Sequence, residues 1–319
     1  MDLIKEEYIA HIRRSDKCRQ TVKEHNDGVA RLAKRSGAMY GLGNLAFFSG
    51  WYHDIGKNTM IYYNYINDAA DGKPAVRGSV LPSIYGACFA DRLAKDTDLF
   101  SRLAAEMIRI SIMSHHGLRN SLTKDGMPAF LRAVERISDS YKQVESIVYE
   151  TYGERVILEE FARACAEARN IQEEINKFHP KRNGLGSAHI YLALYVRLLT
   201  SILIDADCTD TACFEDNVKI PEQMSAKELT AIWCRYRVNC ETEIQKMLWK
   251  KTTSPLDCFR IEISEACDKF DGKSCGIFRL VVPCGAGKTI SALRYALQTA
   301  ERYKKRRIFY IAPSNSILM

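Results

Sequence analysis

The sequence lacks several features that would assign it quickly to a protein class. None of its 11 cysteines stands in a C-x-x-C pair, and their odd number and scatter favour a reducing cytoplasm over a disulfide framework or a zinc site. No apolar run occurs in the charged N-terminal segment, Met1 to Arg14, so no secretory signal peptide is expected. Internal repeats and low-complexity tracts are absent as well. The remaining expectation is a cytoplasmic globular protein.

Long hydrophobic runs are also missing. The most apolar segment, Ile190 to Ile204, is too short to span a bilayer and contains Arg197. We therefore predict a buried core helix in this segment and no association with a membrane.

Composition and charge give the first positive indications. The 319 residues suffice for one large domain and part of another, and 46% hydrophobic with 27% charged residues is ordinary for a soluble globular protein. The net charge of +7 is unevenly distributed: from Lys246 onward 14 Lys and Arg face 6 Asp and Glu, whereas the remainder is nearly neutral. This basic part predicts a polyanionic partner, although basic linkers and solvated faces have similar compositions.

Hydrophobic periodicity predicts a mainly α protein. Over the first two hundred or so residues apolar positions recur at spacings of three and four, as in Leu192, Val196, Leu199 and Leu203. The pattern changes near residue 250, where residues 251–255 read as a linker. Beyond it, residues 276–283 and 307–313 read as buried strands on either side of a helix over residues 289–303. This βαβ unit predicts the start of a parallel sheet, and the chain is expected to end inside that domain.

Histidine and aspartate form an ordered set. Only seven histidines occur, and four of them belong to this set: His25, His53-Asp54 and the doublet His115-His116, followed by Asp205 and Asp207 after the apolar helix. Imidazole and carboxylate together suit divalent ions such as Mn, Fe, Co, Ni or Zn, and such ligands can converge from separate helices of a bundle. A lone histidine is more often a satisfied polar group, which is our interpretation of His11, His179 and His189. The ordered set predicts a catalytic metal site.

A phosphate-binding loop is predicted near the C-terminus. The segment Pro283-Cys284-Gly285-Ala286-Gly287-Lys288-Thr289 follows a predicted strand and opens a predicted helix. Backbone N–H groups of such a loop cradle phosphates, while Lys288 would reach the β and γ phosphates and Thr289 would bind Mg²⁺. The first glycine of the strict pattern is replaced by Val282.

Together these motifs resemble the HD superfamily, and within it the HD nuclease domain of the nuclease-helicase of type I CRISPR systems. Members show an early helical His, an HD-x-G-K motif, a His-His doublet and a late Ala-Asp pair. The matching positions here are His25, His53-Asp54-Ile55-Gly56-Lys57, His115-His116 and Ala206-Asp207. The glycine loop in its P-x-G-x-G-K-T form resembles motif I of superfamily 2 helicases, and residues 309–317 resemble motif Ia. In sequence, this region most resembles the nuclease-helicases of type I-C-like systems.

The resemblance implies a set of roles. The first ion would be held by His25, His53, Asp54 and Asp207. Asp54 would bridge to a second ion on His115 and His116, and Lys57 would place a positive charge near the scissile phosphate. The family's His-Ser-x-x-Gly-Ala segment reads Pro82-Ser83-Ile84-Tyr85-Gly86-Ala87 here, so the second ion loses a ligand and the number of ions, one or two, stays open. Periodicity does not decide between Asp205 and Asp207, and the family pattern favours Asp207.

These inferences combine into one expected architecture and function. Residues 1–250 are expected to form an HD-domain helical bundle, and residues 251–319 the first βαβ unit of a RecA-like α/β helicase domain. The expected activity is hydrolysis of single-stranded DNA with Mn, Ni, Co, Fe or possibly Mg. The resemblance implies recruitment by a CRISPR surveillance complex (Cascade) and use of ATP with Mg²⁺ by the full-length protein. Later helicase motifs are missing before Met319, so this chain alone is expected to lack ATPase and helicase activity.

Two other hypotheses stay open from the sequence. HD chemistry alone also permits a phosphohydrolase that acts on small nucleotides. A third possibility is a catalytically weakened fragment that binds nucleic acid or a protein partner, which the proline at position 82 and the missing motor motifs favour.

Overall fold

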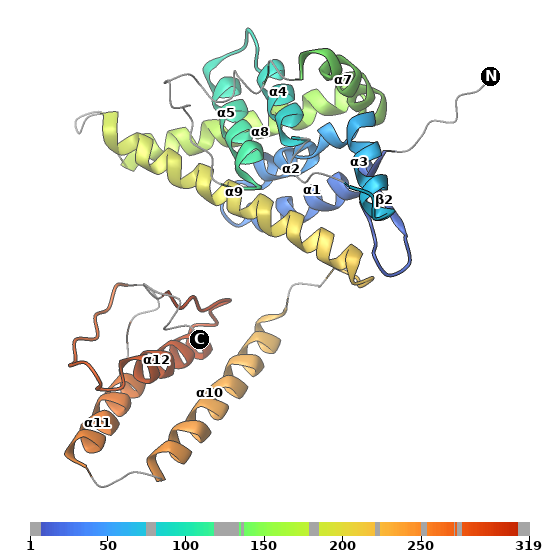
Figure 1. The fold of residues 1–319 in the computed structure, drawn as a ribbon. Coiled ribbons are helices and arrows are strands. Elements are labelled where there is room, and N and C mark those ends of the chain that lie inside the picture. The colour runs from blue at the N-terminus through green and yellow to red at the C-terminus, as the bar shows by residue number, and fades with distance from the viewer. Residues whose placement is uncertain are drawn as a thin grey trace. The chain divides into compact units, whose positions relative to one another are not determined.

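The computed structural model describes residues 8–74, 81–117, 134, 137–178, 185–220, 224–249, 254–270, 272 and 276–311. The chain divides into two compact units, Met1–Ile220 and Pro221–Met319, and is mainly helical as predicted (Figure 1). The sequence predicted a boundary near residue 250. The division lies thirty residues earlier because helix α10 (Ala226–Trp249) packs against α12 (Lys288–Arg302) of the second unit.

The first unit is a helical bundle with a small hairpin at its N-terminal end. In chain order its described elements are β1 (Ile9–Ile12), β2 (Arg19–Thr21), α1 (Val22–Ala38), α2 (Gly43–Tyr52), the 3-10 turn η1 (Ile55–Lys57), α3 (Met60–Ala70), α4 (Ser83–Leu93), α5 (Leu99–Ser114), α7 (Ser138–Tyr152), α8 (Glu154–Phe178) and α9 (Leu185–Glu215). Strands β1 and β2 pair antiparallel, with an irregularity between Ile9 and His11.

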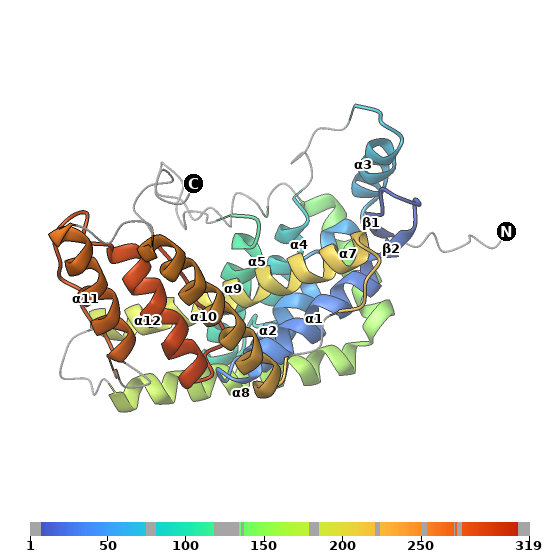
Figure 2. The ribbon, with the colours of Figure 1, turned by 90° about the horizontal axis from the view of Figure 1, so that it is seen from below.

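The core of this unit forms where the long helices meet. Helix α1 packs along α2 and α9, and both α2 and α5 contact α8 as well as α9 (Figure 2). Large aromatic and aliphatic side chains fill the space between them, including Phe48, Tyr52, Phe89, Ile108 and Leu199, all nearly fully buried. The cysteines among the described residues are all free.

The start of α2 is held by a neighbouring helix. Leu42, at the N-cap, offers no side-chain cap, and the carboxylate of Glu167 on α8 takes that role. It accepts hydrogen bonds from the backbone N–H groups of Asn44 and Leu45 at 2.8–2.9 Å, and from the Asn44 side chain. A carboxylate at a helix N-terminus satisfies unpaired N–H groups and complements the helix dipole. Helix α8 therefore fixes the position of α2, whose far end carries His53 and Asp54.

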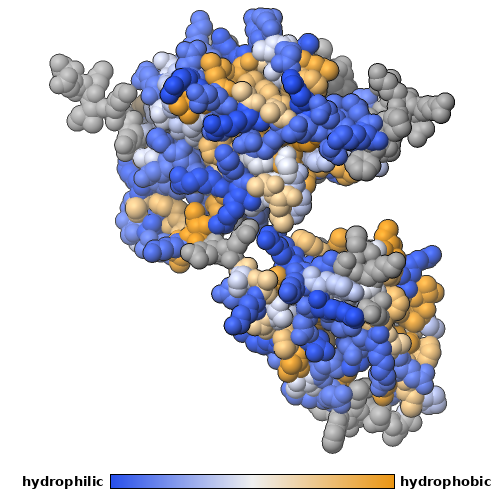
Figure 3. Space-filling model, turned by 180° about the vertical axis from the view of Figure 1, so that it is seen from behind, coloured by the Kyte–Doolittle hydropathy of each residue, from blue (hydrophilic) through white to orange (hydrophobic). Residues whose placement is uncertain are grey.

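The segment Ile190 to Ile204, predicted as a buried core helix, lies in α9 but is buried only in its last part: Ile190 and Leu194 are exposed at 62% and 55%. Helix α9 extends to Glu215, and its part from His189 to Glu215 is long and apolar enough, by length and composition alone, to cross a membrane. Its C-terminal half nevertheless packs on α1 and α5 and contributes Leu199 and Leu203 to the core. On the face shown in Figure 3, hydrophilic side chains cover much of the surface, beside separate hydrophobic patches. The protein thus has the character of a soluble one, and α9 serves as a core helix through its second half.

The described residues of the second unit form three packed helices and irregular segments. Helix α12 lies where the sequence predicted one, and α11 (Pro255–Lys269) packs beside it. The bidentate pair of Arg294 with Glu241, with its two N–O distances at 2.5 Å, ties α12 to α10.

The two strands predicted in this unit are not formed within the described residues. Residues 276–283 and 307–311 have no strand assignment, and residues 312–313 lie outside the described part. Apolar side chains in both segments stay exposed, with Ile277 at 97% and Ile311 at 91%. A strand needs a paired neighbour for its backbone groups, and the described residues of this unit supply none. Residues 277–280 instead line a cavity of about 580 Å³ beside α11 and α12.

Candidate metal centre

Four structural elements deliver the predicted site residues to one place. His25 lies in the first half of α1, whose start is fixed by a capping box between Thr21 and Glu24. His53 is the C-cap of α2 and His115 the C-cap of α5, so each histidine stands where a helix ends, and both are buried. Asp207 comes from α9.

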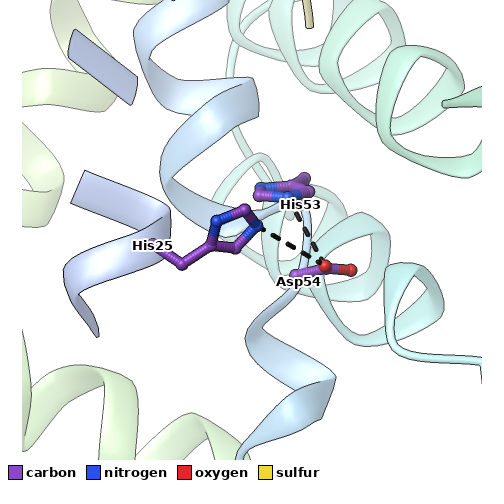
Figure 4. A group of neighbouring side chains, drawn as sticks. All are labelled: His25, His53 and Asp54. Atoms are coloured by element: carbon purple, nitrogen blue, oxygen red, sulfur yellow. Dashed lines mark ion pairs between the residues drawn. The ribbon is translucent and has the colours of Figure 1, made fainter. Parts of the chain in front are cut away.

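The imidazole and carboxylate groups converge closely. The Nε2 atoms of His25 and His53 lie 4.0 and 3.5 Å from Oδ2 of Asp54, as the dashed lines in Figure 4 show. The same two nitrogens lie 3.3 and 3.7 Å from Oδ1 of Asp207. On the other side of Asp54, Nε2 of His115 is 3.8 Å from Oδ1. Potential ligand atoms of three subsets lie within 4.8 Å of one another: His25-His53-Asp54, His53-His115-Asp207 and Asp54-His115-His116.

The two nitrogens of each buried imidazole have different surroundings. Nδ1 of His53 lies 2.8 Å from the carbonyl oxygen of Gly50, and Nδ1 of His115 lies 2.6 Å from that of Ile112. Nδ1 of His25 lies 2.9 Å from Asp210. By contrast, the three Nε2 atoms and Oδ1 of Asp54 are buried without a hydrogen-bond partner. Histidine ligands of metals use one nitrogen for the ion and direct the other to an oxygen, and this arrangement fits that pattern.

The pKa values of the ionisable groups in the cluster are strongly shifted by burial and by neighbouring charges. Burial alone would raise the pKa of Asp54, but the charges of Lys57 and His53 outweigh burial and hold that pKa well below its usual range. The pKa of Asp207 is also strongly lowered. Burial would raise it, but the interactions with His25 and His53 outweigh the effect of burial. Burial would lower the pKa of His53, but both carboxylates raise it. Both aspartates are therefore ionised and demand positive charge beside them.

Lys57 is the one fixed cation next to Asp54 in the described part of the cluster. Its Nζ lies 2.9 Å from Oδ2 of Asp54, 3.5 Å from the carbonyl oxygen of Ala10 and 3.3 Å from Nε2 of His11. Burial would lower the pKa of Lys57, and Asp54 raises it above the usual value instead. Burial and the charge of Lys57 lower the pKa of His11 to about 2, so His11 is neutral and accepts from Lys57. Sequence reasoning treated His11 as an ordinary histidine.

The remaining predicted residues are placed as follows. His116 is exposed at the edge of the cluster, with its ring centroid 3.8 Å from that of His115. Asp205 is exposed and belongs to none of the three ligand subsets, whereas Asp207 belongs to one. Pro82 is the N-cap of α4 and lies against Gly56, two residues after Asp54. Pro82 has no ligand atom in its side chain.

Asp210 and Gln20 were missed altogether by the sequence analysis. Asp210 accepts from His25 and from Nε2 of Gln20, both at 2.9 Å. The only signal for Asp210 was its position three residues after Asp207, which places both on one side of a helix. Nothing in the sequence pattern distinguished Gln20.

The glycine loop of the second unit has the backbone that phosphate loops need. Gly285 and Gly287 have φ of 80° and 79°, a left-handed conformation that side chains disfavour, and Gly287 is the N-cap of α12. Lys288 and Thr289 follow in the first turn and are exposed. Nε of Arg260, on α11, donates to the carbonyl oxygen of Gly285 at 2.8 Å and braces the loop.

The donor set of the first unit could hold a metal ion. Imidazole nitrogen and carboxylate oxygen suit such ions, and buried donors without partners are otherwise costly. The carboxylates of Asp54, Asp207 and Asp210 with the ammonium of Lys57 leave two negative charges, which one divalent ion would balance. In comparisons with known proteins, no family model matches the chain, and no curated protein matches it.

Proposed function

We propose that the first unit is a metal-dependent phosphodiesterase of HD type that cuts single-stranded DNA. The observation that carries the proposal is the convergence of three buried Nε2 atoms and Oδ1 of Asp54, none of them with a hydrogen-bond partner, in a cluster with excess negative charge. A cluster built only for stability would satisfy these atoms or replace them with apolar groups. The resemblance of the ordered motif to HD nucleases supplies the substrate class.

The ligand assignment follows the resemblance, and the distances support it. His25, His53, Asp54 and Asp207 would hold the first ion: the first three form one close subset, and Asp207 lies 3.3 and 3.7 Å from the two imidazoles. His115 and His116 with Asp54 offer a second position. The charge balance and the proline at position 82 favour one tightly bound ion, with Mn, Ni, Co or Fe preferred over Mg because of the imidazole ligands. When bound, such an ion supplies Lewis-acid activation toward a phosphate ester.

The protein's own groups perform the remaining tasks. Lys57 holds Asp54 in the orientation seen here and provides a positive charge that attracts the phosphodiester backbone. Backbone contacts of this kind bind DNA without reading its sequence. Recruitment by a CRISPR surveillance complex and a cytoplasmic location belong to the same proposal.

The proposal is tested by cleavage of circular single-stranded DNA with Mn²⁺, Ni²⁺, Co²⁺ or Mg²⁺, against EDTA. We expect cutting that depends on metal and is lost in Asp207→Asn. The matched control is Asp205→Asn, because Asp205 lies two residues away on the same helix but is exposed, so cleavage should be retained. Equal activity of both variants, or no cutting by folded protein with any of the ions, would count against the proposal.

Assays with small nucleotides distinguish a nucleotide phosphohydrolase from a nuclease that cuts DNA. Release of phosphate from nucleoside triphosphates, or of monophosphates from cyclic nucleotides, without cutting of DNA would assign the site to a nucleotide phosphohydrolase. Tight metal binding without turnover of any of these substrates would favour the nucleic-acid-binding fragment.

For the second unit we propose nucleotide binding at Gly285, Gly287, Lys288 and Thr289, with ATP and Mg²⁺ as ligands. The left-handed glycines that lead directly into the N-terminus of α12 support it, because helix N-termini and glycine-rich loops of this kind bind phosphates. We expect weak binding of a fluorescent ATP analogue that falls at least about tenfold in Lys288→Ala, since a point charge on the phosphates is removed. Lys304→Ala, an exposed lysine beyond the same helix, should bind as the wild type does.

A further inference from the structure

The imidazole of His25 is held between two carboxylates of one helix. Its Nε2 lies 3.3 Å from Asp207, on the side of the ligand cluster, and its Nδ1 lies 2.9 Å from Asp210, on the opposite side. The two aspartates are three residues apart on α9, so both project toward α1. His25 is fully buried, and its ring has no freedom to leave this position.

Asp210 is itself fixed by its surroundings. Its side chain is 8% exposed, and Gln20 on β2 donates to the same oxygen that faces His25. Helix α1 leaves room for it only because residue 28 is glycine: a Cβ there would lie 2.1 Å from Oδ1 of Asp210. Two helices and the hairpin therefore meet at this carboxylate.

The chemistry of the contact determines where His25 carries its proton. A carboxylate only accepts hydrogen bonds, and carboxylates face both nitrogens of His25. Asp210 lies within hydrogen-bond distance of Nδ1 at 2.9 Å, whereas Nε2 is 3.3 Å from Asp207 and makes no hydrogen bond. This difference favours the hydrogen on Nδ1 and leaves the lone pair on Nε2 toward the ligand cluster. His53 and His115 reach the same tautomer through neutral carbonyl oxygens. His25 alone of the three has an anionic partner, which strengthens its nitrogen as a metal ligand more than a carbonyl does.

We propose that Asp210 is a positioning residue of the metal centre that fixes the tautomer and orientation of His25, with Gln20 and Gly28 holding Asp210 in place. This inference rests on the proposed metal site. It assigns a role outside the ligand set to a residue that never touches the ion or the substrate.

The first test measures Mn²⁺ affinity by calorimetric titration of the full chain. Asp210→Asn and Gly28→Ala are expected to bind Mn²⁺ about 10- to 100-fold more weakly than the wild type, the range known for partners of metal-bound histidines. Asp205→Asn, on the same helix and exposed, should bind with wild-type affinity. Thermal unfolding of each variant identifies those that fold, and Gln20→Leu provides a third variant should Asp210→Asn fail to fold.

The second test reads the tautomer in the metal-free protein. Long-range proton–nitrogen NMR spectra, with the His25 signals assigned by comparison with His25→Gln, should show the hydrogen on Nδ1 in the wild type and a shift toward Nε2 in Asp210→Asn. A wild type that binds no Mn²⁺ would overturn the proposed metal site. A wild type that binds Mn²⁺, alongside folded variants with unchanged affinity and unchanged tautomer, would overturn only the role of Asp210.

Discussion

Asp54→Ala is expected to remove metal binding and to lower the free energy of unfolding by about 3–5 kcal/mol, because it leaves a buried cation without its partner. The ammonium of Lys57 lies 2.9 Å from Asp54, and its other contacts, Ala10 and His11, carry no negative charge. Mn²⁺ titration and urea unfolding measure the two effects. The loss of binding follows from the removal of a carboxylate that adjoins His25, His53 and His115.

The double variant Asp54→Ala/Lys57→Met separates these effects. Removing the stranded ammonium should restore most of the lost stability, since replacing both members of a buried ion pair by apolar groups is often neutral or better. Metal binding should stay absent. A double variant as unstable as the single one would show that Lys57 is not the cause of the destabilisation, and Mn²⁺ binding by Asp54→Ala at wild-type affinity would remove Asp54 from the ligand set.

Gly86→Ala is expected to destabilise the first unit by about 3 kcal/mol or more, at the upper end of overpacking effects. A Cβ at this position of α4 would lie 1.9 Å from the carbonyl oxygen of Tyr52, a backbone atom that cannot turn aside. Tyr52 directly precedes His53, so relief of the clash shifts the end of α2 and weakens Mn²⁺ binding as well.

The sign of this effect makes the measurement decisive. Helix propensity alone predicts that Gly→Ala inside a helix stabilises by about 1 kcal/mol. Helix propensity and the clash with Tyr52 therefore predict opposite signs for the change in the free energy of unfolding, and equilibrium unfolding distinguishes them. A stability gain in Gly86→Ala would mean that α4 and α2 do not approach as closely as described.

The sequence alone predicted much of the candidate site because its residues stand in an ordered motif. HDIGK and the histidine doublet could be singled out because the residue types and their order match a known chemistry. The choice between Asp205 and Asp207 needed the rotation of α9, which apolar periodicity on both sides had left open. His11 and Asp210 could not be found, because their roles depend on tertiary contacts with Lys57 and His25 rather than on spacing along the chain.

The fold shows the same division between local and long-range information. Helices were predictable from apolar spacing within each segment, and α12 lies where it was expected. The division of the structure at residue 220 differs from the boundary predicted near residue 250, because α10 packs against α12, about forty residues further along the chain. The predicted strands failed for a related reason, since hydrophobic runs such as residues 276–283 become strands only when neighbours pair with them.

The contact of His25 with Asp207 and Asp210 also has a consequence during synthesis on the ribosome. The ribosome synthesises His25 early and, 185 residues later, Asp210. Closing so long a loop costs conformational entropy that only the completed bundle repays. A nascent chain that has not yet released α9 from the ribosome therefore has an incomplete set of ligands. The order of synthesis delays the proposed metal chemistry until the domain around it can fold.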